Sequence, residues 1–402
     1  MDNWKAKIVV MLSSSVVSIF TSSIMQMALI WHLALMTESA LVLSLATMAG
    51  FLPRILLSSF AGALVDRWNR KITIIVADLY LAVVALGLVV YAQFAQPPVW
   101  VVLLALFLRS AGKAFHNPAW NAVLPLIVPK EHMTKFIGYA GSIDTITFIA
   151  GASVAAILYP LWGIQGMIAM EVAGAVLASI VIAVISIPSI APVVRDKGQT
   201  LTTDLKSAFA ILKQHKGMFV LFWITAIFTF FYMPVSSLYP LMSMGHFGGT
   251  TTHASIAEIV FAVGATIGGM LIGVWGGLKK RGVMISAALG IMGLSIVVSG
   301  LLPADGFVFF AGLSFLVGMS VSFYVTPDMA LVQEKIPPEY LGRIFGLRSS
   351  ISAMMTMLGL FVSGISADII GIPVWFVISG GVIFFIAIIT ILMPTVRNIE
   401  EE

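Results

Sequence analysis

The chain has 402 residues, of which 59% are hydrophobic and 10% are charged, and its mean hydropathy is +1.05. Soluble domains contain roughly 25% charged residues, so this composition excludes a water-soluble globular protein. There is no cysteine, which excludes disulfides, thiol nucleophiles and cysteine metal sites. The net charge of +4 does not by itself indicate a partner, and the positions of the basic residues along the chain are more informative.

Twelve continuous apolar stretches follow one another along the chain, each long enough to cross a bilayer as a helix. They are 8–36, 40–65, 72–94, 98–122, 136–161, 164–187, 217–243, 253–277, 283–302, 306–330, 344–370 and 373–394. Strands of outer-membrane barrels alternate apolar and polar residues, which these stretches do not. The first stretch is too long for a signal-peptide core and no small-residue cleavage site follows it, so we expect it to be retained. The sequence predicts an all-α integral membrane protein.

The basic residues lie on one side of the predicted membrane. Of the 22 Lys and Arg residues, Arg54, Arg109 and Lys113 are placed inside helices. The other 19 are assigned to the N-terminus, the even-numbered turns and the C-terminus, with Arg348 counted in the tenth turn although it lies four residues inside the stretch 344–370, and the odd-numbered turns hold none. Cytoplasmic loops carry the positive excess, so both termini are predicted to be cytoplasmic.

A long polar connection separates the first six stretches from the last six, and it includes a predicted amphipathic helix over 201–214. The expected organisation is an N-terminal half (1–187), a cytoplasmic linker (188–216) and a C-terminal half (217–402). Residues of the two halves also match at a constant offset of 208, which indicates a duplicated six-helix unit. The matches are Phe115 with Phe323, Pro129 with Pro337, Glu131 with Glu339, Lys135 with Arg343, and Gly138 with Gly346.

The turn after the second stretch carries the motif Gly62-Ala-Leu-Val-Asp66-Arg67-Trp-Asn-Arg70-Lys71. It fits the pattern G-x-L-x-D-R-x-x-R-[KR] of the major facilitator superfamily, which the chain therefore resembles. Gly62 allows close helix packing, and Asp66 can face arginines or a helix N-terminus. We predict that these residues form a latch that opens and closes as the halves move. A basic turn that only sets topology is the alternative.

More specifically, the chain is similar to the macrolide-efflux branch of the drug:proton antiporters. This resemblance implies the twelve-helix major facilitator fold, a central cavity and drug export in exchange for protons across the bacterial cytoplasmic membrane. The fifth stretch lacks the proline and the glycine spacing of the G-x-x-x-G-P-x-x-G-G pattern that many drug antiporters carry. The resemblance is carried by Asn3-Trp4-Lys5, Met25-Gln26-Met27-Ala28, Gly50-Phe51-Leu52-Pro53, Ala114-Phe115-His116 with Pro118-Ala119, Tyr232-Met233-Pro234, and Gln333-Glu334-Lys335-Ile336 with Glu339-Tyr340-Leu341-Gly342-Arg343. Leu108-Arg109 resembles the second motif of the superfamily, an arginine within the fourth helix.

Charged residues inside the apolar stretches are candidates for proton coupling, because a charge near the bilayer centre is costly and faces a cavity or a partner. Arg109 and Asp144 lie near the midplane of successive helices, so we predict an ion pair in which Asp144 carries the proton. A permanent structural pair is the alternative. Glu258 is a second candidate site for a proton or a cation. Asp78 and Glu171 are predicted to be structural, and Asp328 and Lys113 are expected to be solvated near the inner membrane boundary.

The predicted substrate cavity takes its residues from both halves. Methionine and aromatic side chains suit an adaptable apolar pocket, although packing and lipid contact are the ordinary role of such residues. Arg54 is interpreted either as a partner of Asp144 or as a side chain that extends toward the membrane surface. The cavity residues predicted are Gln26, Arg54, Phe230, Tyr232 and Tyr239.

Several function classes are excluded. The chain has no G-x-x-x-x-G-K-[ST] phosphate loop, no H-E-x-x-H and no G-x-S-x-G, so an ATP-driven pump and an enzyme are not supported. The basic residues flank helices rather than forming a nucleic-acid patch. Two function classes are left. One is a proton-driven exporter of amphiphilic drugs, and the other is a metabolite permease or sensor of the same fold. We expect a monomer that meets a lipophilic substrate, protons and membrane lipid and needs no cofactor or metal.

Overall fold

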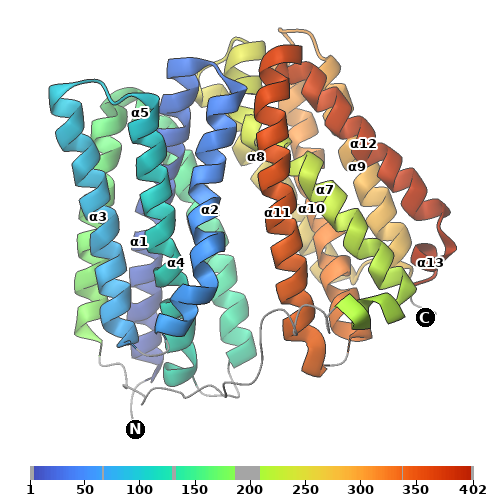
Figure 1. The fold of residues 1–402 in the computed structure, drawn as a ribbon, viewed down its shortest axis with the longest axis horizontal. Helices are drawn as coiled ribbons and strands as arrows, with labels where there is room; N and C mark the ends of the chain where they lie inside the picture. Colours follow the sequence, from blue (N-terminus) through green and yellow to red (C-terminus); the bar gives the residue numbers. More distant parts are fainter. Residues whose placement is uncertain (1–3, 66–67, 129–132, 186–208, 337, 400–402) are drawn as a thin grey trace. The chain divides into compact units, whose positions relative to one another are not determined.

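The computed structural model describes residues 4–65, 68–128, 133–185, 209–336 and 338–399. These residues are almost entirely α-helical, and they include no β-strand. Long apolar segments fold this way because a helix satisfies every backbone hydrogen bond internally, where a bilayer offers no water. The helices form two compact units (Figure 1).

The first unit comprises residues 1–37 and 45–195. Within it, α1 packs along α5, and α3 packs against α4 and α5. In Figure 1 the unit runs from blue to green. Its elements are α1 (Trp4–Thr37), α2 (Ala40–Val65, which belongs to this unit from Leu45 on), α3 (Arg70–Phe94), α4 (Val99–Ile127) and α5 (Met133–Val184).

The element α5 is interrupted at Gly163, where φ is 58° and ψ is −168°. Glycine adopts this backbone conformation readily, whereas a side chain would be strained there. The break separates the predicted stretches 136–161 and 164–187, so a single long element holds both of them.

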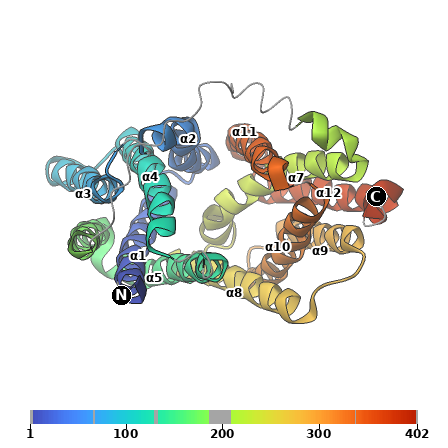
Figure 2. The ribbon, with the colours of Figure 1, turned by 90° about the horizontal axis from the view of Figure 1, so that it is seen from below.

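The second unit comprises residues 38–44 and 196–402. In this unit α10 packs against α8 and α9, α12 against α9, and α7 against α11; Figure 2 shows them in end view. The elements are α7 (Lys216–Leu241), the π-helical turn η2 (Met242–His246), α8 (Thr251–Trp275), α9 (Arg281–Leu301), α10 (Phe307–Lys335), α11 (Pro338–Ile370), α12 (Ile372–Leu392) and α13 (Pro394–Arg397).

Glycines let the helices of the second unit approach closely. A Cβ atom at Gly264 of α8 would lie 2.2 Å from the carbonyl oxygen of Phe315, and one at Gly318 of α10 would lie 2.0 Å from that of Phe261. Small residues at such crossings are typical of membrane helices, where close packing replaces the hydrophobic effect as the source of association.

The predicted all-α membrane fold is confirmed. Among the described residues, eleven helices are long and apolar enough to cross a membrane; the count of twelve and the cytoplasmic termini stay predictions. The expected range 40–65 coincides with α2. Of the predicted linker, 209–214 is helical and 188–208 lies outside the described residues.

Candidate functional site

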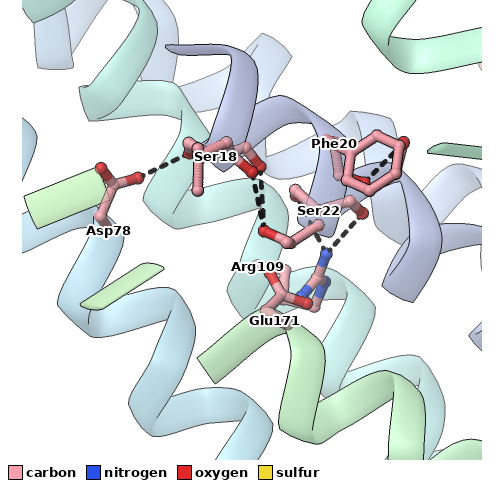
Figure 3. Close-up of polar contacts among 9 residues, drawn as sticks. Ser18, Phe20, Ser22, Asp78, Arg109 and Glu171 are labelled. Atoms are coloured by element: carbon pink, nitrogen blue, oxygen red, sulfur yellow. Dashed lines mark hydrogen bonds and ion pairs between the residues drawn. The ribbon is translucent and has the colours of Figure 1, made fainter. Parts of the chain in front are cut away.

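A row of hydroxyl groups on α1 organises the interior of the first unit. Ser15, Ser18 and Ser22 are spaced three and four residues apart, which puts them on one face of the helix. This face meets buried charged residues from the other helices of the unit (Figure 3). We call the whole set the polar column: Ser15, Ser18 and Ser22 of α1, Asp78 of α3, Arg109 and His116 of α4, and Asp144 and Glu171 of α5.

The first part of the polar column is an ion pair between Arg109 and Glu171, both almost fully buried. Arg109 Nη1 donates to Glu171 Oε2, and Nη2 lies 3.2 Å from the backbone oxygen and from Oγ of Ser22. The predicted ion pair between Arg109 and Asp144 is therefore wrong.

Depth along the helices explains this correction. Arg109 lies ten residues after the start of α4 and Glu171 eight residues after the break in α5, roughly 15 and 12 Å at 1.5 Å per residue. Asp144 lies 19 residues before the same break, at a depth of roughly 28 Å. Because α4 and the first part of α5 run in opposite directions, the break lies at the end where α4 begins, and only Glu171 reaches the level of Arg109.

A second part of the polar column joins Asp78 to His116. Ser18 Oγ donates to Asp78 Oδ1 at 2.9 Å, and His116 Nε2 lies 3.5 Å from the same oxygen. The side chain of Asp78 is 1% exposed, and its Oδ2 has no hydrogen-bond partner among the described residues. The His116 ring is stacked on Trp120, with ring centroids 6.3 Å apart. Sequence reasoning missed this pair because Asp78 and His116 are far apart along the chain and no motif joins them.

The other predicted residues of the first unit have local partners. Asp144 is half-buried and accepts a hydrogen bond from Ser15 Oγ at 3.4 Å. The Arg54 guanidinium carbon lies 5.1 Å from the centroid of the Phe51 ring, a cation–π contact. The interpretation of Arg54 as a partner of Asp144 is thus not supported. Gln26 faces α2, where a Cβ atom at Gly50 would lie 3.4 Å from its Nε2.

The described part of the motif anchors α3. Asn69 is the N-cap, since its side chain accepts a hydrogen bond from the backbone N–H of Ile72. Lys71 Nζ donates to the backbone oxygens of Ala183 and Ile185, at 2.6 and 2.7 Å, and so caps the C-terminal end of α5.

The rest of the motif can be placed only in part. Gly62 belongs to α2 and Arg70 begins α3. Asp66 and Arg67 lie outside the described residues. The latch is therefore not tested by the contacts of the first unit.

The second unit has a buried ion pair of its own. Arg348 Nη2 of α11 donates to Asp328 Oδ2 of α10, and the two side chains are 10% and 7% exposed. Thr225 of α7 connects Arg348 to Tyr324. Its Oγ1 lies 3.5 Å from the same Nη2 and accepts a hydrogen bond from Tyr324 at 2.8 Å. The sequence assigned Arg348 to a cytoplasmic turn and Asp328 to a solvated boundary. Both assignments are wrong, because α10 continues to Lys335 and α11 begins at Pro338.

The remaining predicted residues lie on α7 and α8. Glu258 is half-buried on α8 and makes no hydrogen bond or ion pair within the part of the chain that the structure describes. The Tyr232 ring stacks on Phe228 at 4.9 Å between centroids, and Tyr239 packs between two rings of α10 and α12. The backbone of Phe230 packs closely against α11, because a Cβ atom at Gly359 would come within 2.2 Å of the backbone oxygen of Phe230. Tyr232 and Tyr239 thus belong to the aromatic core of the second unit.

The chain matches the Major Facilitator Superfamily over residues 11–358 and 221–401. It is 43% identical to macrolide efflux protein A of Streptococcus pyogenes over 399 residues, which cover 99% of this chain and 98% of that protein. It is 44% identical to macrolide efflux protein A of Enterococcus faecalis over 322 residues, covering 80% of this chain and 99% of that protein.

Solved structures share the fold at low sequence identity. A bacterial homologue of the iron transporter ferroportin, in an inward-facing state, aligns with a TM-score of 0.75 at 14% identity, over 97% of this chain and 99% of that one. The nucleoside transporter NupG aligns with a TM-score of 0.74 at 14% identity, over 97% and 98%. Near full-length relatives and a shared helical fold both agree with the resemblance carried by the motif, and the chain belongs to the Major Facilitator Superfamily, as a multi-pass transporter of a bacterial membrane and not an enzyme.

Proposed function

We propose that this transporter exports macrolides and similar bulky, apolar amines from the cytoplasm in exchange for protons, by alternating access. The observation that carries the proposal is the 43% identity to a macrolide efflux protein over nearly the whole of both chains. Because the alignment covers 99% of this chain, it includes the helices that could contact a substrate.

The charges of the chain support a cationic cargo. A macrolide amine is an ammonium at neutral pH, and it can be met by a carboxylate or lie over an aromatic face. Asp144 and Glu258 are the half-buried acids that we propose for proton coupling and cation recognition. In this proposal Arg109 holds α4 in place through its ion pair with Glu171. Glu258 suits this role because the described residues give it no competing partner.

We also propose contributions to the cavity from both units. In this proposal Gln26, Arg54 and Phe230 contact the drug, while Tyr232 and Tyr239, which are buried in the second unit, shape the wall behind them. Asp66 and Arg67 serve as the latch of the proposed cycle. The protein is proposed to work as a monomer with both termini and the linker in the cytoplasm.

Drug tolerance tests the proposed cargo. Expression in a host without its own pumps should raise the inhibitory concentration of erythromycin-like macrolides, and an Asp66→Asn variant expressed to the same level should raise it less. Ethidium accumulation is measured in the same cells. Ethidium export without macrolide tolerance would replace the macrolide proposal by a multidrug one, and failure to export either compound would favour a metabolite permease.

A further inference from the structure

The Asp78–His116 pair is a buried titratable group that the proposed transport sites leave unused. It lies between three helices, with Asp78 on α3, His116 on α4 and the hydroxyl of Ser18 on α1. Histidine is the side chain whose ordinary titration falls between about pH 5 and pH 8. A histidine in contact with a buried carboxylate can therefore change the net charge of the interior within the physiological range.

The contact geometry couples the two charges. With His116 protonated, Asp78 Oδ1 lies beside a positive charge 3.5 Å away, and with His116 neutral the buried carboxylate keeps only the Ser18 hydrogen bond. A buried charge without a partner is much more costly than a paired one. The charge on either residue thus changes the cost of the charge on the other.

The pair lies next to other charged residues, one of which, Asp144, is more accessible than Asp78. On α4, Arg109, Lys113 and His116 are spaced four and three residues apart and share one helix face. Asp144 lies close enough for its charge to interact with His116, and it is half-buried whereas Asp78 is buried. Of the described titratable or charged groups, Asp78 on α3 and Asp144 on α5 interact with His116 itself. The others belong to the same network at one remove: Glu171 on α5 interacts with Asp78, Arg109 and Lys113, Arg54 on α2 interacts with Lys113, and Tyr80 on α3 lies beside Gly112 of α4.

We propose that Asp78 and His116 together form a proton-binding site of the transport cycle. The proton binds to the ring nitrogen of His116 that carries the lone pair of the neutral imidazole, and it leaves by breaking the same N–H bond. In the loaded state the pair is an ion pair with no net charge, and in the unloaded state it carries one negative charge.

Ser18 is a positioning residue of this site, because it holds Asp78 Oδ1 toward α1 and α4. A shift of α1 relative to α3 and α4 would change the distance between the two charges and so release or accept the proton. The inference rests on the proposed proton-driven export, since it names where that proton is held.

The stacking of Trp120 on His116 offers a readout that needs no substrate. An imidazolium beside an indole changes the indole fluorescence, so the fluorescence of the purified, full-length protein should show a step as the pH is varied. We expect the step to be lost in His116→Gln and shifted in Asp78→Asn. The matched control is His32→Gln, because His32 is also half-buried in the first unit but is hydrogen-bonded to Tyr159, at 3.3 Å.

Transport in proteoliposomes gives the second readout. The wild type should move erythromycin uphill when a pH gradient is imposed and should move protons when an erythromycin gradient is imposed. His116→Gln and Asp78→Asn should lose both kinds of coupling, while erythromycin exchange at equal pH persists at a reduced rate. Asp78→Glu should restore part of the coupling with a shifted pH profile, which a purely structural role would not produce. His32→Gln should keep the wild-type profile.

The outcomes separate this inference from the proposed function. Uphill transport by His116→Gln with the wild-type pH profile would overturn the inference while leaving the exporter intact. An unchanged fluorescence step in both variants would overturn it as well. If wild-type protein moves no macrolide but its fluorescence step depends on both residues, the exporter proposal fails and the proton-binding site stands. If Asp78→Asn does not yield a monodisperse protein, Asp78→Glu takes its place in the titration, with a shifted step expected.

Discussion

Arg109 shows how a single residue can stabilise a membrane interior while being costly to bury. Its side chain is 1% exposed, and Glu171 and Ser22 supply its described partners. Removing one partner of a buried pair leaves the other charge uncompensated, whereas replacing both with apolar residues of similar volume is often neutral or stabilising. Arg109 and Glu171 can therefore be replaced together with little loss of stability, but not one at a time.

A stability measurement checks this view of the pair. Glu171→Leu should destabilise the protein by about 3–5 kcal/mol, and adding Arg109→Met should recover most of that loss. The exposed pair between Arg281 and Glu334 is the control, since Glu334→Gln should cost less than about 1 kcal/mol. Unfolding midpoints in detergent report all three variants and the wild type. A Glu171→Leu protein as stable as the wild type would mean that Arg109 finds another partner.

Asp144 calls for a different measurement, because its proposed role is coupling rather than stability. Asp144→Asn keeps the size of the side chain and its ability to accept from Ser15, but it cannot release a proton. We expect uphill macrolide transport driven by a pH gradient to be lost while downhill exchange continues. Uphill transport at the wild-type rate would make Asp144 a structural partner of α1 and nothing more.

At the scale of the helix, the sequence predicts which segments are helices far better than which way each helix faces. Helix α2 occupies the predicted range 40–65, because a continuous apolar run between charged turns defines its length. The partner of Arg109 could not be predicted in the same way. A helix that is apolar on all sides has no pattern to reveal its rotation, and one residue of error rotates a side chain by about 100°.

The Asp328–Arg348 pair illustrates a second limit of the sequence. Both residues lie close to the expected ends of apolar stretches, where a charge is ordinarily solvated. The helices extend beyond the apolar runs, to Lys335 in α10 and back to Pro338 in α11, so the two charges are inside the unit. Hydropathy locates the apolar core of a helix, but it does not show where backbone hydrogen bonding stops.

The contact between α8 and α10 gives a prediction for a helix pair. Alanine favours a helix over glycine by about 1 kcal/mol, so Gly318→Ala would be stabilising in open space. Here its Cβ would lie 2.0 Å from the backbone oxygen of Phe261, which cannot move without shifting α8. We expect a lower unfolding temperature for Gly318→Ala. Gly312→Ala on the same helix meets nothing within 4 Å and should match or exceed the wild type. Equal stability of the two variants would contradict the close packing.

For the molecule as a whole, the proposed cycle requires two units that move as bodies. Each unit has its own interior and its own buried ion pair, Arg109–Glu171 in the first and Asp328–Arg348 in the second. Charges that are satisfied within one unit are not disturbed when the units change position. The motif around Asp66 is then the part of the first unit expected to respond to that change.

Asp66→Asn should slow the exchange between inward-open and outward-open states and shift their populations, because it removes the charge of the proposed latch. Macrolide affinity should change little. Distances between spin labels on the cytoplasmic faces of the two units, with and without drug, measure the populations. Glu334→Gln is the control, since it also removes one carboxylate charge, but from an exposed ion pair with Arg281 within the second unit, and it should leave the distances unchanged. An unchanged distance distribution with intact transport would reduce the motif to a topological signal.

The serine row of α1 also bears on how the chain enters the membrane. A central Asp, Lys or Arg costs about 2.5–3.5 kcal/mol during insertion, and α1 has none between Lys7 and Glu38. Its hydroxyl groups can bond to the helix's own backbone until partners arrive, as Ser23 does with Phe20 and Thr21 with Val17. The charges that these hydroxyls eventually meet come later in synthesis, on α3, α4 and α5. Because α1 is synthesised before these helices, it can partition into lipid without them and then serve as the polar surface on which the later, charged helices assemble.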